Sequence, residues 1–344
     1  MVIIKVKSSE VAMTKMQASF YIVKFCSRLK GLRRDAGWHT GLHQSLFKKK
    51  GGRILVYHGI CQGDPLHFNT LFIRLKTFEK QLRLYKKYFN IISLNDFYKQ
   101  RFSDEKFSIC LTFDDGFASN YKYVLPLLEQ YQIPATFFLT GIRQAGYDIL
   151  WNDVLAIAAK YGPSKISFQN EVFIKNSHGK YISFLDDKPL VEKLRSTEFE
   201  SKAALIEILG HLKNKVDEDY WLQMTEDQIK KLSESKWVSI GSHGHYHNDL
   251  AKISDVSAKE ELSLSKRFLE NIIGREIRAL AFPYGSYTRE VIEQAKQANY
   301  QQLLATEFLF PEDTCDAMLR ERFTINPFIS TINQLHANVS GKYK

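Results

Sequence analysis

The chain has 344 residues, of which 44% are hydrophobic and 25% are charged, so it can bury a sizeable core in one large domain or two smaller ones. It contains no apolar run of the roughly 20 residues that a membrane-spanning helix needs, no recognisable signal peptide, and four scattered cysteines that suggest neither a disulfide framework nor a zinc ribbon. We therefore expect a cytoplasmic protein with reduced thiols.

The net charge of +10 is concentrated in residues 1–50, which hold eleven lysines and arginines against two acidic residues. The main body is nearly neutral, which argues against nucleic-acid binding. Within this basic extension, apolar residues recur at helical spacing among basic ones and predict an amphipathic helix: Ala18, Ile22, Phe25, Leu29 and Leu32. Two interpretations stay open, namely peripheral contact with an anionic membrane and packing on the main domain.

From residue 51 onward, strand-like and helix-like segments alternate. Residues 53–60, 90–94, 107–113 and 134–140 are compact apolar runs, and residues 72–88 and 121–132 have helical periodicity between them. The strand pattern returns at residues 237–243, 279–285 and 302–306. This order predicts an α/β protein with a parallel sheet or barrel covered by helices. A long, charged and mainly helical stretch at about 145–235 interrupts the order and is interpreted as an insertion.

Two adjacent carboxylates, Asp114 and Asp115, end the apolar strand of residues 107–113. An ionised carboxylate removed from water costs several kcal/mol unless a cation or hydrogen bonds meet it. Taken alone, Asp-Asp-Gly is most often a turn in which Gly116 adopts positive φ and the aspartates cap the next helix. A buried strand that ends on paired charges nevertheless raises the question of which cation accompanies them.

Three histidines, His243, His245 and His247, directly follow the predicted strand of residues 237–243. Imidazole nitrogens and carboxylate oxygens are the usual ligands of a catalytic divalent metal, which needs about three protein ligands and an open position. By itself such a cluster can be a surface loop. Both motifs, however, lie at the C-terminal ends of predicted strands, where barrel enzymes assemble their sites. The joint interpretation is a metal site.

The segments "LTFDDG", "SHGHYHNDL" and "AFPYG", in this order, resemble the polysaccharide deacetylase family, metal-dependent carbohydrate esterases of the family 4 type that include chitin, peptidoglycan and poly-N-acetylglucosamine deacetylases. The resemblance covers roughly residues 53 to 310, and "LVYHGI" resembles the first strand of one branch. It implies a distorted, incomplete (β/α) TIM-like barrel over residues 51–344, with the insertion as a variable region.

The resemblance also implies roles for individual residues. Asp114 matches the general base, whereas Asp115, His243 and His247 match the metal ligands, with Zn²⁺ as the expected ion and Co²⁺ or Mn²⁺ as substitutes. In the implied mechanism Asp114 activates a water held by the metal, which attacks the N-acetyl group. Pro283 and Tyr284 of the third motif are expected to contact substrate, and the backbone N–H of Tyr284 is expected to stabilise the oxyanion.

Departures from the family pattern concern the arginine and the acid. Ala281 stands where many members have an arginine that orients the base, and Arg320 or Arg322 are candidates to replace it. The acid that protonates the leaving amine has two candidates, His336 near the C-terminus and His58 in "VYHGI".

We therefore expect a metal-dependent hydrolase that removes an N-acetyl group from a sugar of a bacterial envelope polysaccharide or its lipid-linked precursor. The expected partner is an N-acetylated glycan at the cytoplasmic side, and no nucleic-acid partner is expected. Two alternatives stay open: a catalytically weak sugar-binding or assembly protein on the same fold, and an extracytoplasmic chitin or peptidoglycan deacetylase.

Overall fold

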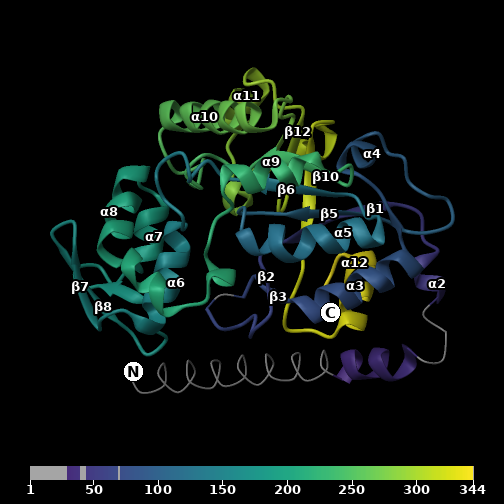
Figure 1. The fold of residues 1–344 in the computed structure, drawn as a ribbon, viewed down its shortest axis with the longest axis horizontal. Helices are drawn as coiled ribbons and strands as arrows, with labels where there is room; N and C mark the ends of the chain where they lie inside the picture. The colour runs from purple at the N-terminus through teal and green to yellow at the C-terminus, as the bar shows by residue number, and fades with distance from the viewer. Residues whose placement is uncertain (1–28, 39–43, 69, 344) are drawn as a thin grey trace, which may run out of the picture.

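A computed structural model of the chain describes residues 29–38, 44–68 and 70–343 (Figure 1). Most of the predicted amphipathic helix, including Ala18, Ile22 and Phe25, lies outside these residues. Residues 29–37 are helical. In the described part of the chain, no helix combines the length and the apolar character that a membrane span requires.

Seven parallel strands close into a barrel, which confirms the predicted incomplete (β/α) barrel. The strand order is β1-β13-β12-β11-β10-β6-β5, and β5 pairs back to β1, while β4 extends the sheet beside β5. The bounds are β1 Gly52–Tyr57, β4 Asn90–Ile91, β5 Ser108–Phe113, β6 Ala135–Leu139, β10 Val238–Ser242, β11 Ala279–Ala281, β12 Gln302–Ala305 and β13 Leu319–Thr324. A short parallel pair, β2 Ile60–Cys61 and β3 Ile73–Arg74, follows β1.

The apolar runs of the sequence form these strands because both of their faces are buried. All six residues of β5 are buried. Its odd-numbered residues, such as Leu111 and Phe113, join the large core beneath the helices. Cys110 instead joins a smaller cluster with Ile54 and Phe138, residues of the neighbouring strands. Alternation along each strand therefore separates the contents of the barrel from the core between strands and helices.

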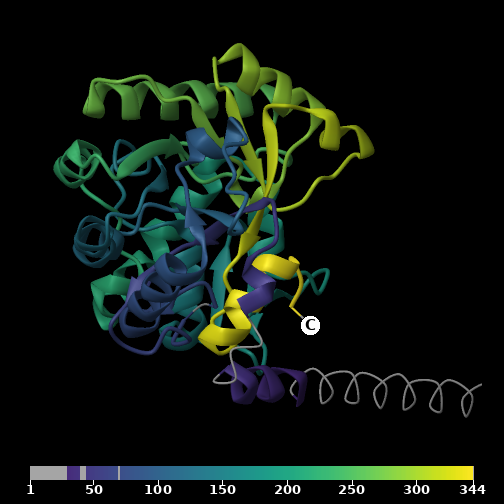
Figure 2. The ribbon, with the colours of Figure 1, turned by 90° about the vertical axis from the view of Figure 1, so that its right-hand side faces the viewer.

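Helices cover the outside of the barrel, and Figures 1 and 2 show α10 and α11 along one side and α3, α5 and α12 along another. In α3 the residues Phe78, Leu82 and Tyr85 recur at helical spacing and are buried, as expected for a helix that packs on a sheet. The helices of the barrel are α2 Gln44–Phe47, α3 Leu75–Tyr88, α4 Leu94–Tyr98, α5 Leu125–Tyr131, α9 Glu226–Glu234, α10 Asp255–Ile273, α11 Arg289–Gln297 and α12 Thr331–Ser340.

The segment between β6 and α9 forms a small unit beside the barrel, at the left of Figure 1. It contains α6 Trp151–Tyr161, α7 Leu190–Arg195 and α8 Phe199–Leu209. It also contains a three-stranded antiparallel sheet, β7 Lys165–Phe168, β8 Glu171–Lys175 and β9 Tyr181–Ser183, which the sequence analysis did not predict. Trp151, Phe173 and Leu205 belong to its own hydrophobic cluster. We refer to residues 149–221 as the inserted unit.

Strand β13 is the barrel strand that the sequence analysis missed. Its sequence, "LRERFT", has three charged residues and lacks an apolar run. The strand nevertheless closes the barrel, since it pairs with both β12 and β1. Its residue Arg322 is 5% exposed and is paired in register with Ile54. A charged side chain on this strand therefore enters the barrel, where it needs a partner.

Candidate active site

The two aspartates lie where β5 ends, in a turn that forces an unusual backbone. The N–H of Asp114 donates to the carbonyl of Tyr57 at 2.9 Å, which continues the pairing of β5 with β1. Asp115 then has φ of 73° and Gly116 has φ of 86°. Left-handed conformations are costly for a non-glycine residue and are concentrated at functional sites. Both aspartates are 3% exposed, so their charges need buried partners.

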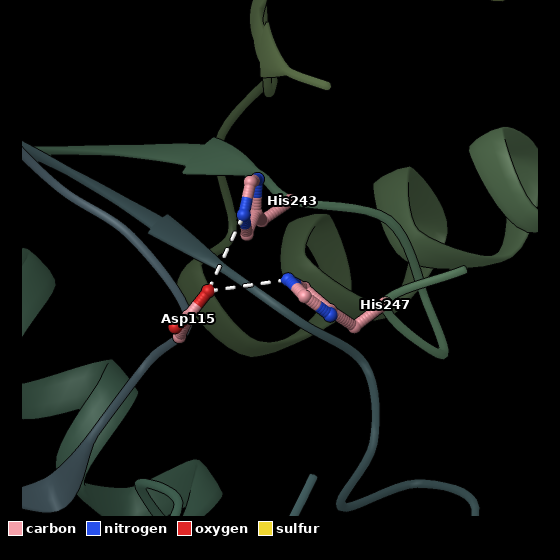
Figure 3. Close-up of side chains that lie close together, drawn as sticks. All are labelled: Asp115, His243 and His247. Carbon is pink, nitrogen blue, oxygen red and sulfur yellow. Dashed lines mark ion pairs between the residues drawn. The ribbon is translucent and has the colours of Figure 1, made fainter. Parts of the chain in front are cut away.

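The side chains of His243 and His247 converge on Asp115 (Figure 3). Oδ1 of Asp115 lies 3.4 Å from Nε2 of His243 and 3.3 Å from Nε2 of His247. The loop after β10 achieves this convergence because Gly244 and His247 both have positive φ, 75° and 57°. One oxygen and two nitrogens from two strand ends therefore face a common point.

These three residues fit a divalent metal. Their potential ligand atoms all lie within 4.8 Å of one another, and all three residues are buried. Nδ1 of His243 lies 2.8 Å from the carbonyl oxygen of Ala281, so Nδ1 carries a proton and donates to that carbonyl, while Nε2 faces Asp115 and is the nitrogen that would bind a metal once it is deprotonated. A histidine that donates its other N–H to a carbonyl is the usual arrangement of a metal ligand. One oxygen and two imidazole nitrogens are a donor set typical of zinc and similar ions.

Arg322 of β13 supplies the cation for Asp114. Its Nη1 and Nη2 each donate to one oxygen of Asp114 at 2.7 Å. Burial alone raises the pKa of Asp114, but the charges of Arg322 and His243 and the hydrogen bonds from Arg322 outweigh it, so the pKa lies below its ordinary value. Of the two predicted replacements for the family arginine, Arg322 is the one that pairs with Asp114. Arg320 instead donates to the carbonyl oxygens of Asp316 and Leu319.

The two acid candidates lie at opposite ends of the barrel. His58 directly follows β1, whose last residue is paired in register with Phe113 just before Asp114. Its charge lowers the pKa of both Asp114 and Asp115. The ring of His336 lies 6.2 Å from that of Phe47, whose carbonyl accepts from the N–H of Phe107, just before β5 begins. The structure therefore brings His58 to the aspartates and does not bring His336 there.

Pro283 and Tyr284, in the short turn after β11, pack against residues 243–250, which we call the histidine loop. The ring of Tyr284 is centred 4.9 Å from that of His247, and Tyr284 has φ of 61°. Pro283 lies against Gly244, where a Cβ would meet its Cγ at 3.3 Å. Gly285 cannot be replaced without a shift, because a Cβ would lie 2.1 Å from the Thr306 hydroxyl. The third motif is thus placed beside the metal ligands, and the role of the Tyr284 N–H stays a prediction.

His245 points away from the two other histidines. Its ring lies over Gly141, where a Cβ would meet Nδ1 at 1.9 Å, and is centred 6.0 Å from the ring of Phe268. Burial lowers the pKa of His245 to about 4, so the ring is neutral at neutral pH. His245 is thus a neutral imidazole packed against the backbone of Gly141, and it does not join the candidate metal site that His243 and His247 form with Asp115.

The inserted unit contacts the histidine loop with two buried or half-buried cations that the sequence analysis did not identify. Nζ of Lys202, a fully buried residue, donates to Oδ1 of Asn248 and, at 2.9 Å, to the carbonyl of Thr197. Nη2 of Arg195 donates to Oδ2 of Asp249 at 2.6 Å. From the sequence, Lys202 and Arg195 cannot be distinguished from the solvent-exposed charges of the same helical stretch, because their spacing follows no pattern of buried residues. The loop that carries His247 is therefore anchored by the inserted unit.

Glu261 of α10 holds the same loop from the barrel side. Its Oε1 accepts from the backbone N–H groups of Tyr246 and Asn248, both at 3.1 Å. The ring of Phe199 stacks on that of Tyr246, with centroids 4.2 Å apart and planes 11° apart. Helix α10, through Glu261, and helix α8 of the inserted unit, through Phe199, thus hold the backbone on either side of His247.

Comparison with known proteins agrees with this geometry. Residues 103–169 and 201–303 match the family model described as polysaccharide deacetylase. The protein YxkH of Bacillus subtilis (strain 168), named as a polysaccharide deacetylase, is 21% identical over 258 residues, which cover 74% of this chain and 64% of YxkH. The chain therefore spans less than two thirds of the length of that relative.

Two solved structures share the fold. The Streptococcus pyogenes deacetylase PplD, determined in complex with acetate, has a TM-score of 0.55 at 19% identity, over 85% of this chain and 99% of that one. IcaB from Ammonifex degensii has a TM-score of 0.52 at 17% identity, over 85% of this chain and 98% of that one. At these identities the likeness concerns the fold.

Proposed function

Because the chain belongs to the polysaccharide deacetylase family, we propose that it is a metal-dependent hydrolase that removes the N-acetyl group from a sugar of a bacterial envelope polysaccharide or its lipid-linked precursor. The observation that carries the proposal is the meeting of two buried groups at one end of the barrel. Asp115, His243 and His247 form a donor set for a metal, and Asp114 lies beside it with both oxygens held by Arg322.

Each side chain has a defined task in the proposed reaction. A divalent ion, proposed to be Zn²⁺ with Co²⁺ or Mn²⁺ as substitutes, supplies a Lewis acid when bound by Asp115, His243 and His247. Asp114 is ionised through its pair with Arg322 and accepts the proton of the attacking water. His58, at the adjacent strand end, is the proposed donor of a proton to the leaving amine.

Arg322 weakens the alternative of a catalytically weak sugar-binding or assembly protein. That alternative drew on Ala281, which stands where an arginine would orient the base. Arg322 reaches the same carboxylate from another strand with two hydrogen bonds of 2.7 Å, so the base is oriented and charged without an arginine at position 281.

The proposal is tested by metal analysis and acetate release. The purified protein should bind about one equivalent of divalent ion and release acetate from at least one member of a panel of β-1,4- and β-1,6-linked N-acetylglucosamine oligosaccharides and peptidoglycan fragments. Asp114→Asn serves as the matched inactive protein. A protein that binds these glycans with its metal in place but releases no acetate would support the non-catalytic alternative.

A peripheral position at the cytoplasmic membrane surface is a further part of the proposal. Leu32 and Phe328 are 64% and 63% exposed and line one hollow. The helix of residues 29–37 is anchored beneath it, since Asn333 donates to the carbonyl of Gly31 and to Asp35. Exposed apolar side chains among lysines and arginines suit an anionic bilayer. We propose that this surface brings the barrel to a lipid-linked glycan.

A further inference from the structure

Asn120 is a fully buried asparagine that uses its side chain on the backbone of His58. It is 0% exposed, and its Nδ2 donates to the carbonyl oxygen of His58 at 2.8 Å. Among the described residues, no donor lies within hydrogen-bond distance of its Oδ1. A buried acceptor without a partner destabilises a fold, so packing alone does not explain an asparagine at this position.

Three successive carbonyl groups around His58 each accept a hydrogen bond from another segment. The carbonyl before that of His58 accepts from the N–H of Asp114 at 2.9 Å, and the carbonyl after it accepts from the N–H of Ile73 at 3.0 Å. Asn120 holds the carbonyl between them, and it is the only one of the three donors that is a side chain. A substitution at Asn120 can therefore remove one anchor of His58 while the backbone pairing on both sides stays in place.

The ring of His58 depends on these backbone anchors for its position. In the described part of the chain, the ring has no hydrogen-bond partner of its own. His58 and Asp114 directly follow the paired ends of β1 and β5. Asn120 opens a π-helical turn, Asn120–Val124, shortly after the aspartates, and such turns are frequent at functional sites. One short segment thus carries the candidate base, the candidate metal ligand Asp115 and the hold on His58.

We propose that Asn120 is a positioning residue, which holds His58 where its ring can protonate the leaving amine. The inference rests on the proposed function and adds a residue to it. His58 gives its proton to the amide nitrogen as the C–N bond breaks, so the ring must lie within hydrogen-bond reach of that nitrogen. A displacement of a reacting group by about 1 Å can lower a rate about a hundredfold. Loss of the Asn120 anchor should therefore impair the step that needs this proton.

The test compares a substrate that needs the acid with one that does not. The amine of tri-N-acetylchitotriose, or of its β-1,6-linked isomer, must be protonated to leave, whereas 4-nitrophenyl acetate releases a stable phenolate. Asn120→Leu removes the amide donor, and in Asn120→Ser the hydroxyl is too short to reach the carbonyl. In the metal-loaded protein we expect both variants to lower kcat for the trisaccharide about tenfold to a hundredfold with KM nearly unchanged, and to change kcat for the ester by less than about threefold.

A double-mutant cycle shows whether Asn120 acts through His58. The measured quantity is the ratio of kcat for the trisaccharide to kcat for the ester. In the His58→Ala background the acid is absent, so Asn120→Leu should change this ratio by less than about twofold. A purely structural effect of Asn120→Leu would lower the ratio by the same factor in both backgrounds.

Asn338 of α12 provides the matched control. It is also 0% exposed, and its Nδ2 donates to the hydroxyl of Tyr85 at 3.1 Å while its Oδ1 accepts from Gln334 at 2.7 Å. Asn338→Leu should lower the unfolding temperature and leave the ratio unchanged. A second measurement is independent of turnover: the NMR resonance of the His58 ring, assigned by its loss in His58→Ala, should shift in Asn120→Leu and stay in place in Asn338→Leu.

The outcomes distinguish the positioning role from the proposed function. An unchanged ratio in the Asn120 variants, or an equal loss with and without His58, refutes the positioning role and leaves the deacetylase standing. Failure of both Asn120 variants to fold assigns the residue to the fold and also refutes the role. If the wild type releases no acetate from either trisaccharide, the deacetylase is contradicted for these substrates and the resonance decides: a shift in Asn120→Leu supports the hold on His58, and an unmoved resonance refutes it.

Discussion

Replacement of Arg322 by methionine tests whether the buried pair with Asp114 replaces the arginine that the third motif lacks. Methionine keeps much of the length of the side chain and removes its charge. The side chains of Arg322 and Asp114 are 1% and 3% exposed. Among the described residues, the other basic side chain within 4.0 Å of Asp114 is the imidazole of His243, at 3.8 Å. The variant thus leaves a buried carboxylate with its main partner removed.

The expected loss of stability follows from this geometry. Removal of one partner from a buried, hydrogen-bonded ion pair costs about 3–5 kcal/mol, because the other charge stays buried. In urea unfolding at pH 7 this loss should lower the midpoint by on the order of 1–2 M. Asp114→Asn combined with Arg322→Met should recover part of the loss, since no charge is then left unpaired.

The pH dependence has a defined sign. The pKa of Asp114 in the folded protein lies below its ordinary value, about 3.9, so the pair stabilises the fold above that pH and its contribution is lost as the pH falls through the folded-state pKa. Without Arg322, burial raises the pKa of Asp114. The acidic limb of the profile of kcat/KM against pH should therefore move to higher pH, because the base becomes protonated earlier.

Arg320→Met is the matched control, since Arg320 lies on the same strand and donates to two carbonyl oxygens. It should change stability by about 1 kcal/mol and leave the acidic limb in place. If Arg322→Met unfolds at the wild-type urea concentration and keeps the wild-type acidic limb, Asp114 does not depend on Arg322 and the assignment of its role is wrong.

Three further comparisons address the candidate metal ligands, the histidine loop and the N-terminal extension. His243→Ala should remove most bound metal, whereas Asp114→Asn should keep it and lower turnover about 10²–10⁴-fold; equal metal loss in both, measured by elemental analysis, would contradict the division of roles. Lys202→Met should weaken Zn²⁺ affinity about tenfold, the usual scale for groups behind a ligand, while Lys215→Met, an exposed lysine of the same unit, should match wild type in competition with a chelator. Removal of residues 1–49, the whole basic extension, should abolish salt-sensitive binding to anionic liposomes and spare acetate release from soluble fragments. A full-length protein that ignores such liposomes at low salt would refute membrane contact.

The positions of the metal and base candidates could be predicted from the sequence because they depend on strand ends. A parallel barrel brings the C-terminal ends of its strands together, and both "FDDG" and "HGHYH" directly follow apolar runs. The order of strand-like and helix-like segments specified that architecture, since strands with both faces buried need continuous apolar sequence. Asp114, Asp115, His243 and His247 accordingly meet at one end of β5 and β10.

Only the tertiary structure shows that Arg322, and not Arg320, pairs with Asp114, and that His58, and not His336, lies near the two aspartates. Arg322 lies 208 residues from Asp114, on a strand whose charged sequence has no strand-like pattern, and only the closure of the barrel brings the two together. The sequence offered His336 as a weak match to the family's acid and His58 as an alternative. His336 on α12 packs near Phe47. His58 lies near the aspartates because β1 and β5 are adjacent strands in register, so their ends lie side by side.

The sequence by itself determined the order of strands and helices and the aspartate and histidine residues of the candidate site, since both depend on neighbouring residues in the chain. The tertiary structure alone decided which charges are buried. Lys202, Arg195 and Asp153 occur in a charged helical stretch that is indistinguishable from a solvent-exposed surface. The burial of Lys202 and the half-burial of Arg195 accompany the contact of the inserted unit with the histidine loop. Such long-range contacts have no local signature, because the free energy of burying a charge depends on partners that are distant in the chain.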